Sequence, residues 1–212
     1  MIISGELKPG QALPAERQLA QMLKISRPTL RQAISALAAT NVVESRHGGG
    51  TFVTALTPDL LTAPLDFLLQ IDPKALSYLF DVRRALEVTA SQFSATRITP
   101  VELGRLREIL AATGEVIDDA DAFIEHDRRL HRLIVESVHN PIYDSLCLSI
   151  ERLSDDSRRR LGAERSVRAA SHDDHVAIVR ALEAHDPELA AAAMSRHLTN
   201  VEAAATKSSA RE

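Results

Sequence analysis

Hydrophobic and polar positions divide the chain into a short first region and a longer second one. Over residues 14–39, apolar residues recur at intervals of three and four on either side of a short break, which predicts two amphipathic helices joined by a tight turn. Residues 42–53 alternate around a glycine tip, which predicts two strands. From Pro58 onward the helical spacing continues without a convincing strand. The pattern predicts a mainly α fold, with a winged helix-turn-helix head and small β-wing followed by an all-α antiparallel helical bundle.

The first of the two head helices is expected to open at Pro14, since proline lacks the N–H that the first turn leaves unused. Ser26 is the expected N-cap of the second helix. The positions expected to face inward are Leu19, Ala20, Leu23 and Ile25 on the first helix and Leu30, Ala33, Ile34 and Leu37 on the second.

That arrangement leaves Arg27, Thr29 and Arg31 on the outer face, near the N-terminal end of the second helix. A recognition helix meets base edges in the major groove with this end, and arginine suits bidentate contact with guanine. The glycines after His47 alone would fit a floppy loop, but at this distance from a helix-turn-helix they favour a wing. The head therefore predicts sequence-specific DNA binding.

The head resembles the GntR family of bacterial transcription regulators. The matching positions are Gly5, Leu7, Pro9, Gly10, Leu13, Pro14, Glu16, Arg17, Leu19, Ala20, Ser26, Arg27, Leu30, Arg31, Ala33, Leu37, Gly50 and Val53. The resemblance implies DNA contacts at Arg17, Arg27, Arg31, His47 and Gly48. Arg17 also has an alternative interpretation as a solvated helix residue. Family members carry a further helix before the Gly5 to Leu7 segment. Either the start of this sequence is misplaced or clipped, or the first helix of the head is truncated, and a truncated head would be less stable and bind its operator more weakly.

Charge is divided unevenly between the two regions. Residues 1–54 hold six Lys and Arg against three acidic residues, whereas the whole chain of 212 residues has a net charge of −4. A basic head on an acidic body fits DNA contact at one end. The single cysteine, Cys147, lies among leucines and is expected to be a small core residue in a reducing compartment. Without a spanning segment or a signal-peptide pattern, the expected location is cytoplasmic, with no membrane partner.

Helix starts in the second region are marked by a capping residue followed by proline, at Asp72, Thr99, Asn140 and Asp186. About six to seven helices are expected. The predicted domains are the DNA-binding head at 1–54, a linker and connecting helix at 55–72, a helical effector- and metal-binding domain at 73–205 and a disordered tail at 206–212.

The helical region also holds candidate metal ligands. Asp127 and His131 are four residues apart, so they share one helix face, while His175 and His197 lie on two further helices. One carboxylate and three imidazoles would form a metal site with open coordination positions. From spacing alone, the alternative is that each histidine is a surface or capped residue.

A second resemblance covers these residues. The run from Asp127-x-x-x-His131 through Asn140-Pro141 and Asp174-His175 to Met194-x-x-His197-Leu198 is similar to the FCD effector-binding domain of the FadR subgroup. The resemblance implies a divalent metal, compatible with Zn, Ni, Mn or Fe, held by Asp127, His131, His175 and His197, with a small carboxylate effector beside it. Of the other histidines, His172 is the substitute ligand if one assignment fails.

Arg83 belongs to a segment similar to the family's R-x-x-L-E pattern. Two interpretations are open. The guanidinium faces a cavity and binds the effector carboxylate, or Arg83 pairs with Glu87 at i,i+4 on a solvated face.

These patterns together predict a transcription regulator, and specifically a repressor, that is not an enzyme. It would bind an inverted-repeat operator in double-stranded DNA as a homodimer, under the control of a small organic acid. The alternatives are a metal-dependent hydrolase, which leaves the head unexplained, and a metabolite sensor that has lost DNA binding.

Overall fold

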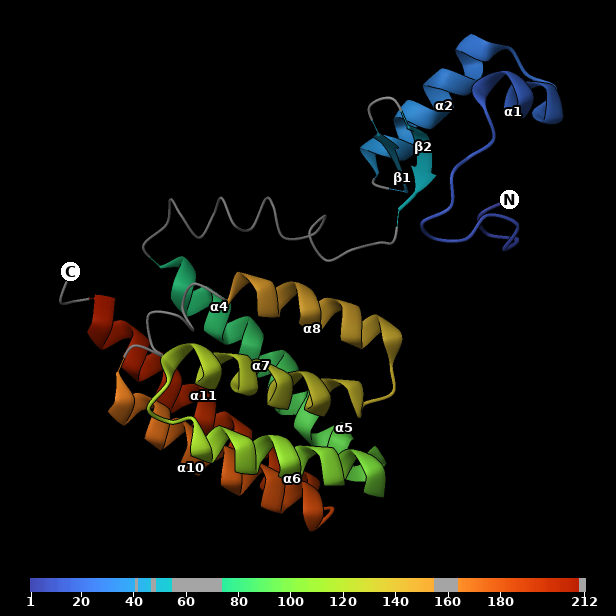
Figure 1. Ribbon diagram of the computed structural model, residues 1–212. Coiled ribbons are helices and arrows are strands. Elements are labelled where there is room, and N and C mark those ends of the chain that lie inside the picture. The colour runs from blue at the N-terminus through green and yellow to red at the C-terminus, as the bar shows by residue number, and fades with distance from the viewer. Residues whose placement is uncertain (41, 47–48, 55–73, 155–163, 210–212) are drawn as a thin grey trace. The chain divides into compact units, whose positions relative to one another are not determined.

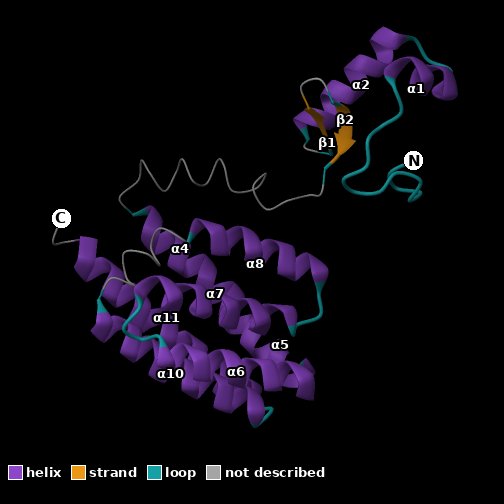
Figure 2. Ribbon diagram, viewed as in Figure 1, coloured by secondary structure: helices purple, strands orange, loops and turns teal. Residues whose placement is uncertain are grey.

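The structure is a computed structural model that describes residues 1–40, 42–46, 49–54, 74–154 and 164–209. The chain folds into two compact units, Met1–Leu60 and Leu61–Glu212. Strands occur only in the described part of the first unit, and helices make up most of the described part of the second (Figure 2). Among the described residues, no helix combines the length and the apolar composition needed to cross a membrane.

The first unit is a winged helix-turn-helix, as its hydrophobic pattern predicts. Helices α1 (Glu16–Leu23) and α2 (Arg27–Ala39) are joined by a turn, and strands β1 (Val43–Arg46) and β2 (Gly50–Val53) pair antiparallel. Ser26 is the N-cap of α2, and its hydroxyl accepts a hydrogen bond from the Thr29 backbone N–H. The segment before α1 also hydrogen-bonds to β2, because the Leu13 backbone N–H donates to the Thr51 carbonyl at 2.7 Å.

The head is less fully packed than its apolar pattern predicts. Leu19, Ala20 and Leu30 are buried, but Leu23 and Leu37 are 47% and 38% exposed. The same holds for Ile25 and Ala33, which are also exposed, and α1 begins at Glu16 rather than Pro14. In the described part of the head, Met1, Leu13 and Ile34 add partly buried apolar contacts to the small core of Leu19, Ala20 and Leu30. An apolar stripe becomes core only where a second element covers it.

The second unit is an antiparallel helical bundle (Figure 1). Its helices are α4 (Ala75–Arg83), α5 (Thr89–Arg97), α6 (Pro100–Glu115), α7 (Ala120–Glu136), α8 (Pro141–Leu153), α10 (Arg165–Glu183) and α11 (Pro187–Ser209). A π-helical turn, η1 (Arg84–Val88), joins α4 to α5 without a break. Helix α8 packs against α4 and α7, while α10 packs against α6 and α11.

Helix starts follow the capping signals in the sequence. Thr99 forms a full capping box with Glu102, and the Asn140 side chain accepts hydrogen bonds from the first turn of α8. The Asp186 carboxylate accepts from the Leu189 backbone N–H at 2.9 Å. The Asp72 signal lies outside the described residues. Side-chain oxygens at these positions satisfy backbone N–H groups that the helix itself leaves without partners.

The main core of the bundle lies between α6, α7, α10 and α11. Its largest fully buried apolar side chains are Leu106, Leu130, Ile134, Ile178, Leu182, Met194 and Leu198. Helix α11 continues to Ser209, so the disordered tail expected from residue 206 is wrong for residues 206–209. The extension has a physical reason, because Ala205 is buried against Phe80 of α4 and holds the end of the helix on the bundle.

Candidate functional site

The four candidate metal ligands meet in the interior of the bundle. Asp127 and His131 come from α7, His175 from α10 and His197 from α11. One potential ligand atom from each residue lies within 4.8 Å of the others. The three histidines are 0–5% exposed, and Asp127 is 9% exposed. The structure thus brings together all four residues that the sequence suggests, from three separate helices.

The Nε2 atoms of two histidines point toward the carboxylate. Asp127 Oδ1 lies 3.3 Å from His175 Nε2 and 3.8 Å from His131 Nε2. The three imidazole rings are close together, with centroids 4.6–5.3 Å apart. This places imidazole nitrogens and a carboxylate oxygen around a common point.

Burial keeps the imidazole of His197 neutral, and the neutral ring is the form that binds a metal ion. Desolvation lowers the pKa of His197 to about 3, and the neighbouring His175 and His131 lower it further against the opposing effect of Asp174. An imidazole with such a pKa is neutral near pH 7, and a neutral imidazole offers a nitrogen lone pair to a cation.

Two carboxylates lie on the outer side of the cluster. Glu87 Oε2 is 2.8 Å from His131 Nδ1, and Asp174 Oδ2 is 3.9 Å from His197 Nδ1. Burial alone would raise the pKa of Asp174, but interactions with His197, Asn200 and Arg196 lower it to about 2. The sequence suggests an Arg83–Glu87 pair and places Asp174 in the FCD pattern, but it does not predict that either carboxylate contacts a candidate metal ligand. Glu87 lies 44 positions before His131, and no short-range spacing links the two.

The donor set fits a divalent metal. Both ring nitrogens of His175 are buried and have no hydrogen-bond partner among the described residues. Buried polar atoms without partners destabilise a fold unless something else satisfies them. A bound cation would do so, and three imidazoles with one carboxylate suit Zn, Ni, Mn or Fe.

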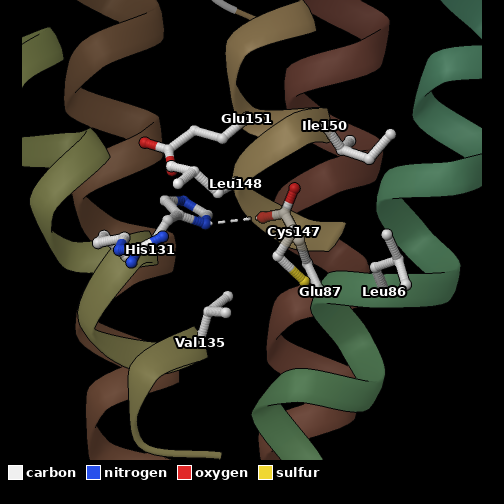
Figure 3. A pocket seen from close by; sticks show the side chains of 9 residues that line it. Leu86, Glu87, His131, Val135, Cys147, Leu148, Ile150 and Glu151 are labelled. Atoms are coloured by element: carbon white, nitrogen blue, oxygen red, sulfur yellow. Dashed lines mark ion pairs between the residues drawn. The ribbon is translucent and has the colours of Figure 1, made fainter. Parts of the chain in front are cut away.

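A small pocket opens beside the cluster (Figure 3). Its lining includes His131, Glu87, Leu86, Cys147 and Glu151. Cys147 is buried, as expected for a core residue, and burial together with Glu87 raises the pKa of its thiol to about 12. The pocket therefore combines apolar walls with two carboxylates and one of the candidate ligands.

Arg83 forms the pair of the second interpretation but in a buried setting, and effector binding by Arg83 stays a prediction. Its Nε donates to Glu87 Oε1 at 2.7 Å, so the i,i+4 pair exists. The pair does not lie on a solvated face, because the Arg83 side chain is only 2% exposed. Its Nη1 is buried and has no hydrogen-bond partner among the described residues. Arg83 reaches the pocket through Glu87, which lines it.

The head presents its candidate DNA-contacting arginines to solvent. Arg27 and Arg31, in the first turns of α2, have side chains 58% and 64% exposed, and Arg17 on α1 is also exposed. Glu16 contacts both α2 arginines, at 2.9 Å from Arg31 Nε and 3.8 Å from Arg27 Nη2. This contact was absent from the sequence analysis.

Of the other residues expected to contact DNA, the structure describes Thr29 but not His47 or Gly48. The hydroxyl of Thr29 lies 2.7 Å from that of Ser26, which ties it to the helix cap. His47 and Gly48 lie outside the described residues. The described part of the head thus places three exposed arginines on the helix-turn-helix.

Comparison with known proteins decides the family. Residues 1–53 match the model of the bacterial regulatory proteins of the gntR family, and residues 78–200 match that of the FCD domain. The chain belongs to the GntR family. Its FCD domain places it in the FadR-like subgroup, and it is a DNA-binding transcriptional regulator.

Curated relatives agree with this assignment. The HTH-type transcriptional regulator LutR of Bacillus subtilis is 29% identical, over 95% of this chain and 94% of LutR. The "Putative L-lactate dehydrogenase operon regulatory protein" of Escherichia coli is 32% identical, over 95% of this chain and 80% of its own length. The HTH-type transcriptional repressor NanR of Citrobacter rodentium is 28% identical, with 96% and 80% covered. These relatives are named as regulators of transcription.

Solved structures agree as well. A Streptococcus agalactiae GntR protein has a TM-score of 0.74 and 27% identity, with 95% of this chain and 93% of that chain covered. The metal-free FCD domain of TM0439 has a TM-score of 0.55 and 27% identity, with 67% and 99% covered. The mainly α fold with a small wing is therefore confirmed.

Because Arg83 is buried, its replacement is expected to destabilise the protein strongly. Replacing Arg83 with Ala leaves the mostly buried Glu87 without its cation, so we expect the free energy of unfolding in urea to fall by about 3 kcal/mol or more. Arg84→Ala is the matched control, because the neighbouring Arg84 is 30% exposed where it pairs with Asp81 and Glu202. It should cost about 1 kcal/mol or less. Equal, small losses in the two variants would contradict the buried pair.

Proposed function

We propose that this regulator is a repressor whose FCD domain binds a small organic acid beside a divalent metal ion. The observation that carries the proposal is the buried cluster of Asp127, His131, His175 and His197, with ligand atoms within 4.8 Å of one another. Neither ring nitrogen of His175 has a hydrogen-bond partner among the described residues, and its Nε2 faces Asp127 Oδ1 at 3.3 Å. Zn, Ni, Mn and Fe all suit such a donor set.

The protein would supply four ligands and leave coordination positions open. When bound, the metal would offer these positions to a carboxylate oxygen of the effector. A small pocket lined in part by His131 adjoins the cluster. Arg83 is the candidate effector-binding cation, because its buried Nη1 has no hydrogen-bond partner among the described residues. The name of the Escherichia coli relative, which refers to an L-lactate dehydrogenase operon, supports an effector of the small organic-acid class.

The head would read double-stranded DNA with Arg17, Arg27, Thr29 and Arg31, together with His47 and Gly48 at the wing. Exposed arginines at the N-terminal end of α2 support this assignment. We infer that a homodimer places two heads on the half-sites of an inverted repeat. Large apolar side chains left exposed on α4 and α8 support an association surface; they are Tyr78, Val82, Ile142 and Leu146.

DNA binding is tested on the recognition helix. Arg31→Ala should weaken binding to the DNA upstream of the protein's own gene by about 5- to 150-fold in a gel shift, because a bidentate base contact contributes about 1–3 kcal/mol. Its metal content should not change. Arg107→Ala is the control, since Arg107 is an exposed arginine in the other unit, paired with Glu183.

Unchanged affinity of Arg31→Ala would remove Arg31 from the interface. A wild-type protein that binds metal and acid but no DNA would instead be a sensor that has lost DNA binding.

Metal binding is tested within α10. Dialysed wild-type protein loaded with zinc should retain one ion per chain by mass spectrometry, and His175→Ala should lose it while still binding DNA in the absence of effector. His172→Ala is the control on the same helix, because His172 does not belong to the cluster. Loss of zinc in both variants, or in neither, would refute the assignment of His175.

A further inference from the structure

The helical segment from Ala75 to Arg97 changes its hydrogen-bond pattern at the level of the cluster. Residues 84–88 form a π-helical turn between α4 and α5. A π turn holds an extra residue, so side chains that follow it are rotated relative to an uninterrupted α-helix, and such turns are frequent at functional sites. Two hydrogen bonds support the turn: the Tyr143 hydroxyl of α8 donates to the Leu86 carbonyl, and the Ser91 hydroxyl of the following α5 turn donates to the Glu87 carbonyl.

The π turn carries Glu87, whose two carboxylate oxygens have different partners. Oε1 accepts from Arg83 Nε at 2.7 Å, and Oε2 lies 2.8 Å from His131 Nδ1. Figure 3 shows Glu87 and His131 facing each other across the pocket. The side chains of Glu87 and His131 are 13% and 6% exposed. Arg83 thus fixes the carboxylate that touches a candidate metal ligand.

This contact determines which nitrogen of His131 is available. A carboxylate at Nδ1 favours the tautomer with a proton on Nδ1, and that tautomer has its lone pair on Nε2. His131 Nε2 is the atom that faces Asp127, at 3.8 Å from Oδ1. The ring therefore has Nδ1 beside Glu87 and Nε2 on the side of the cluster.

We propose that Glu87 is a positioning residue for the metal centre, with Arg83 as its anchor. Glu87 acts through His131 by fixing the tautomer and ring orientation of that ligand. The inference rests on the proposed metal site, since it concerns how tightly that site holds its ion. Carboxylates that accept the second ring N–H of a ligating histidine typically change metal affinity by about 10- to 100-fold.

The affinity test uses Glu87→Gln in the full chain, titrated with zinc in competition with a chromogenic chelator. We expect the zinc Kd to rise about 10- to 100-fold. Glu102→Gln is the matched control, because Glu102 forms a carboxylate–histidine pair with His139 Nε2 at 2.9 Å that involves none of the cluster residues. Glutamine also serves in a capping box, so the start of α6 should persist in this control. Its zinc Kd should match that of the wild type.

A variant that lacks both charges separates positioning from folding. Glu87→Gln leaves Arg83 without its anion, so the pair Arg83→Met with Glu87→Gln replaces the ion pair as a unit. If the single variant unfolds, the pair variant should still show the weaker zinc binding. A wild-type Kd in a folded Glu87 variant would overturn the inference.

The wild-type protein alone gives a second readout that a merely structural role would not move. Long-range ¹H–¹⁵N NMR of the zinc-loaded chain should show His131 protonated at Nδ1 and coordinated through Nε2. Coordination through Nδ1 would overturn the proposal without any variant. If the wild type binds no zinc at all, the metal site itself fails; zinc binding that is insensitive to Glu87 refutes only the positioning role.

Discussion

The C-terminal bundle has to hold three imidazole rings and one carboxylate in contact inside an apolar core. His131, His175 and His197 are almost fully buried, and their rings lie 4.6–5.3 Å apart. Burial lowers the pKa of His197 to about 3, and the two neighbouring imidazoles lower it further. Three helices must therefore keep a fixed relation to one another. Imidazole nitrogens around Asp127 are the arrangement that a cation would stabilise, and the contacts of Glu87 with His131 and of Asp174 with His197 extend it into the surrounding helices.

This arrangement also determines what an effector can do. An acid that adds ligands to the metal alters DNA binding only if it binds one conformation of the protein more tightly than another. The Arg83–Glu87–His131 chain joins the pocket, the π turn and the cluster through contacts of 2.7 and 2.8 Å. A ligand that displaces one of these contacts acts on α4, η1 and α7 together. Under the proposed function, the sensing step would be a change in polar contacts within the apolar core of the bundle.

Sequence reasoning was strongest where a local rule decides the outcome. Capping at Thr99, Asn140 and Asp186 depends on residues within one helical turn, and the structure forms each cap. The four cluster residues emerged from spacing joined to a family resemblance. Burial was less predictable, because it depends on which element covers a face. Leu23 of the head is exposed despite its position in an apolar stripe, and Arg83 is buried despite its i,i+4 partner. The π turn was not foreseen, since a single added residue shifts periodicity too little to be read from one sequence.

The central claim is that Asp127, His131, His175 and His197 hold one divalent metal ion. X-ray absorption spectroscopy of the zinc-loaded wild-type protein tests it most directly. The account predicts a first shell of nitrogen and oxygen only, at about 2.0–2.2 Å, with the multiple-scattering signal of three imidazoles. A sulfur neighbour at about 2.3 Å, which Cys147 would supply, or the spectrum of hydrated zinc without imidazole scattering would contradict it.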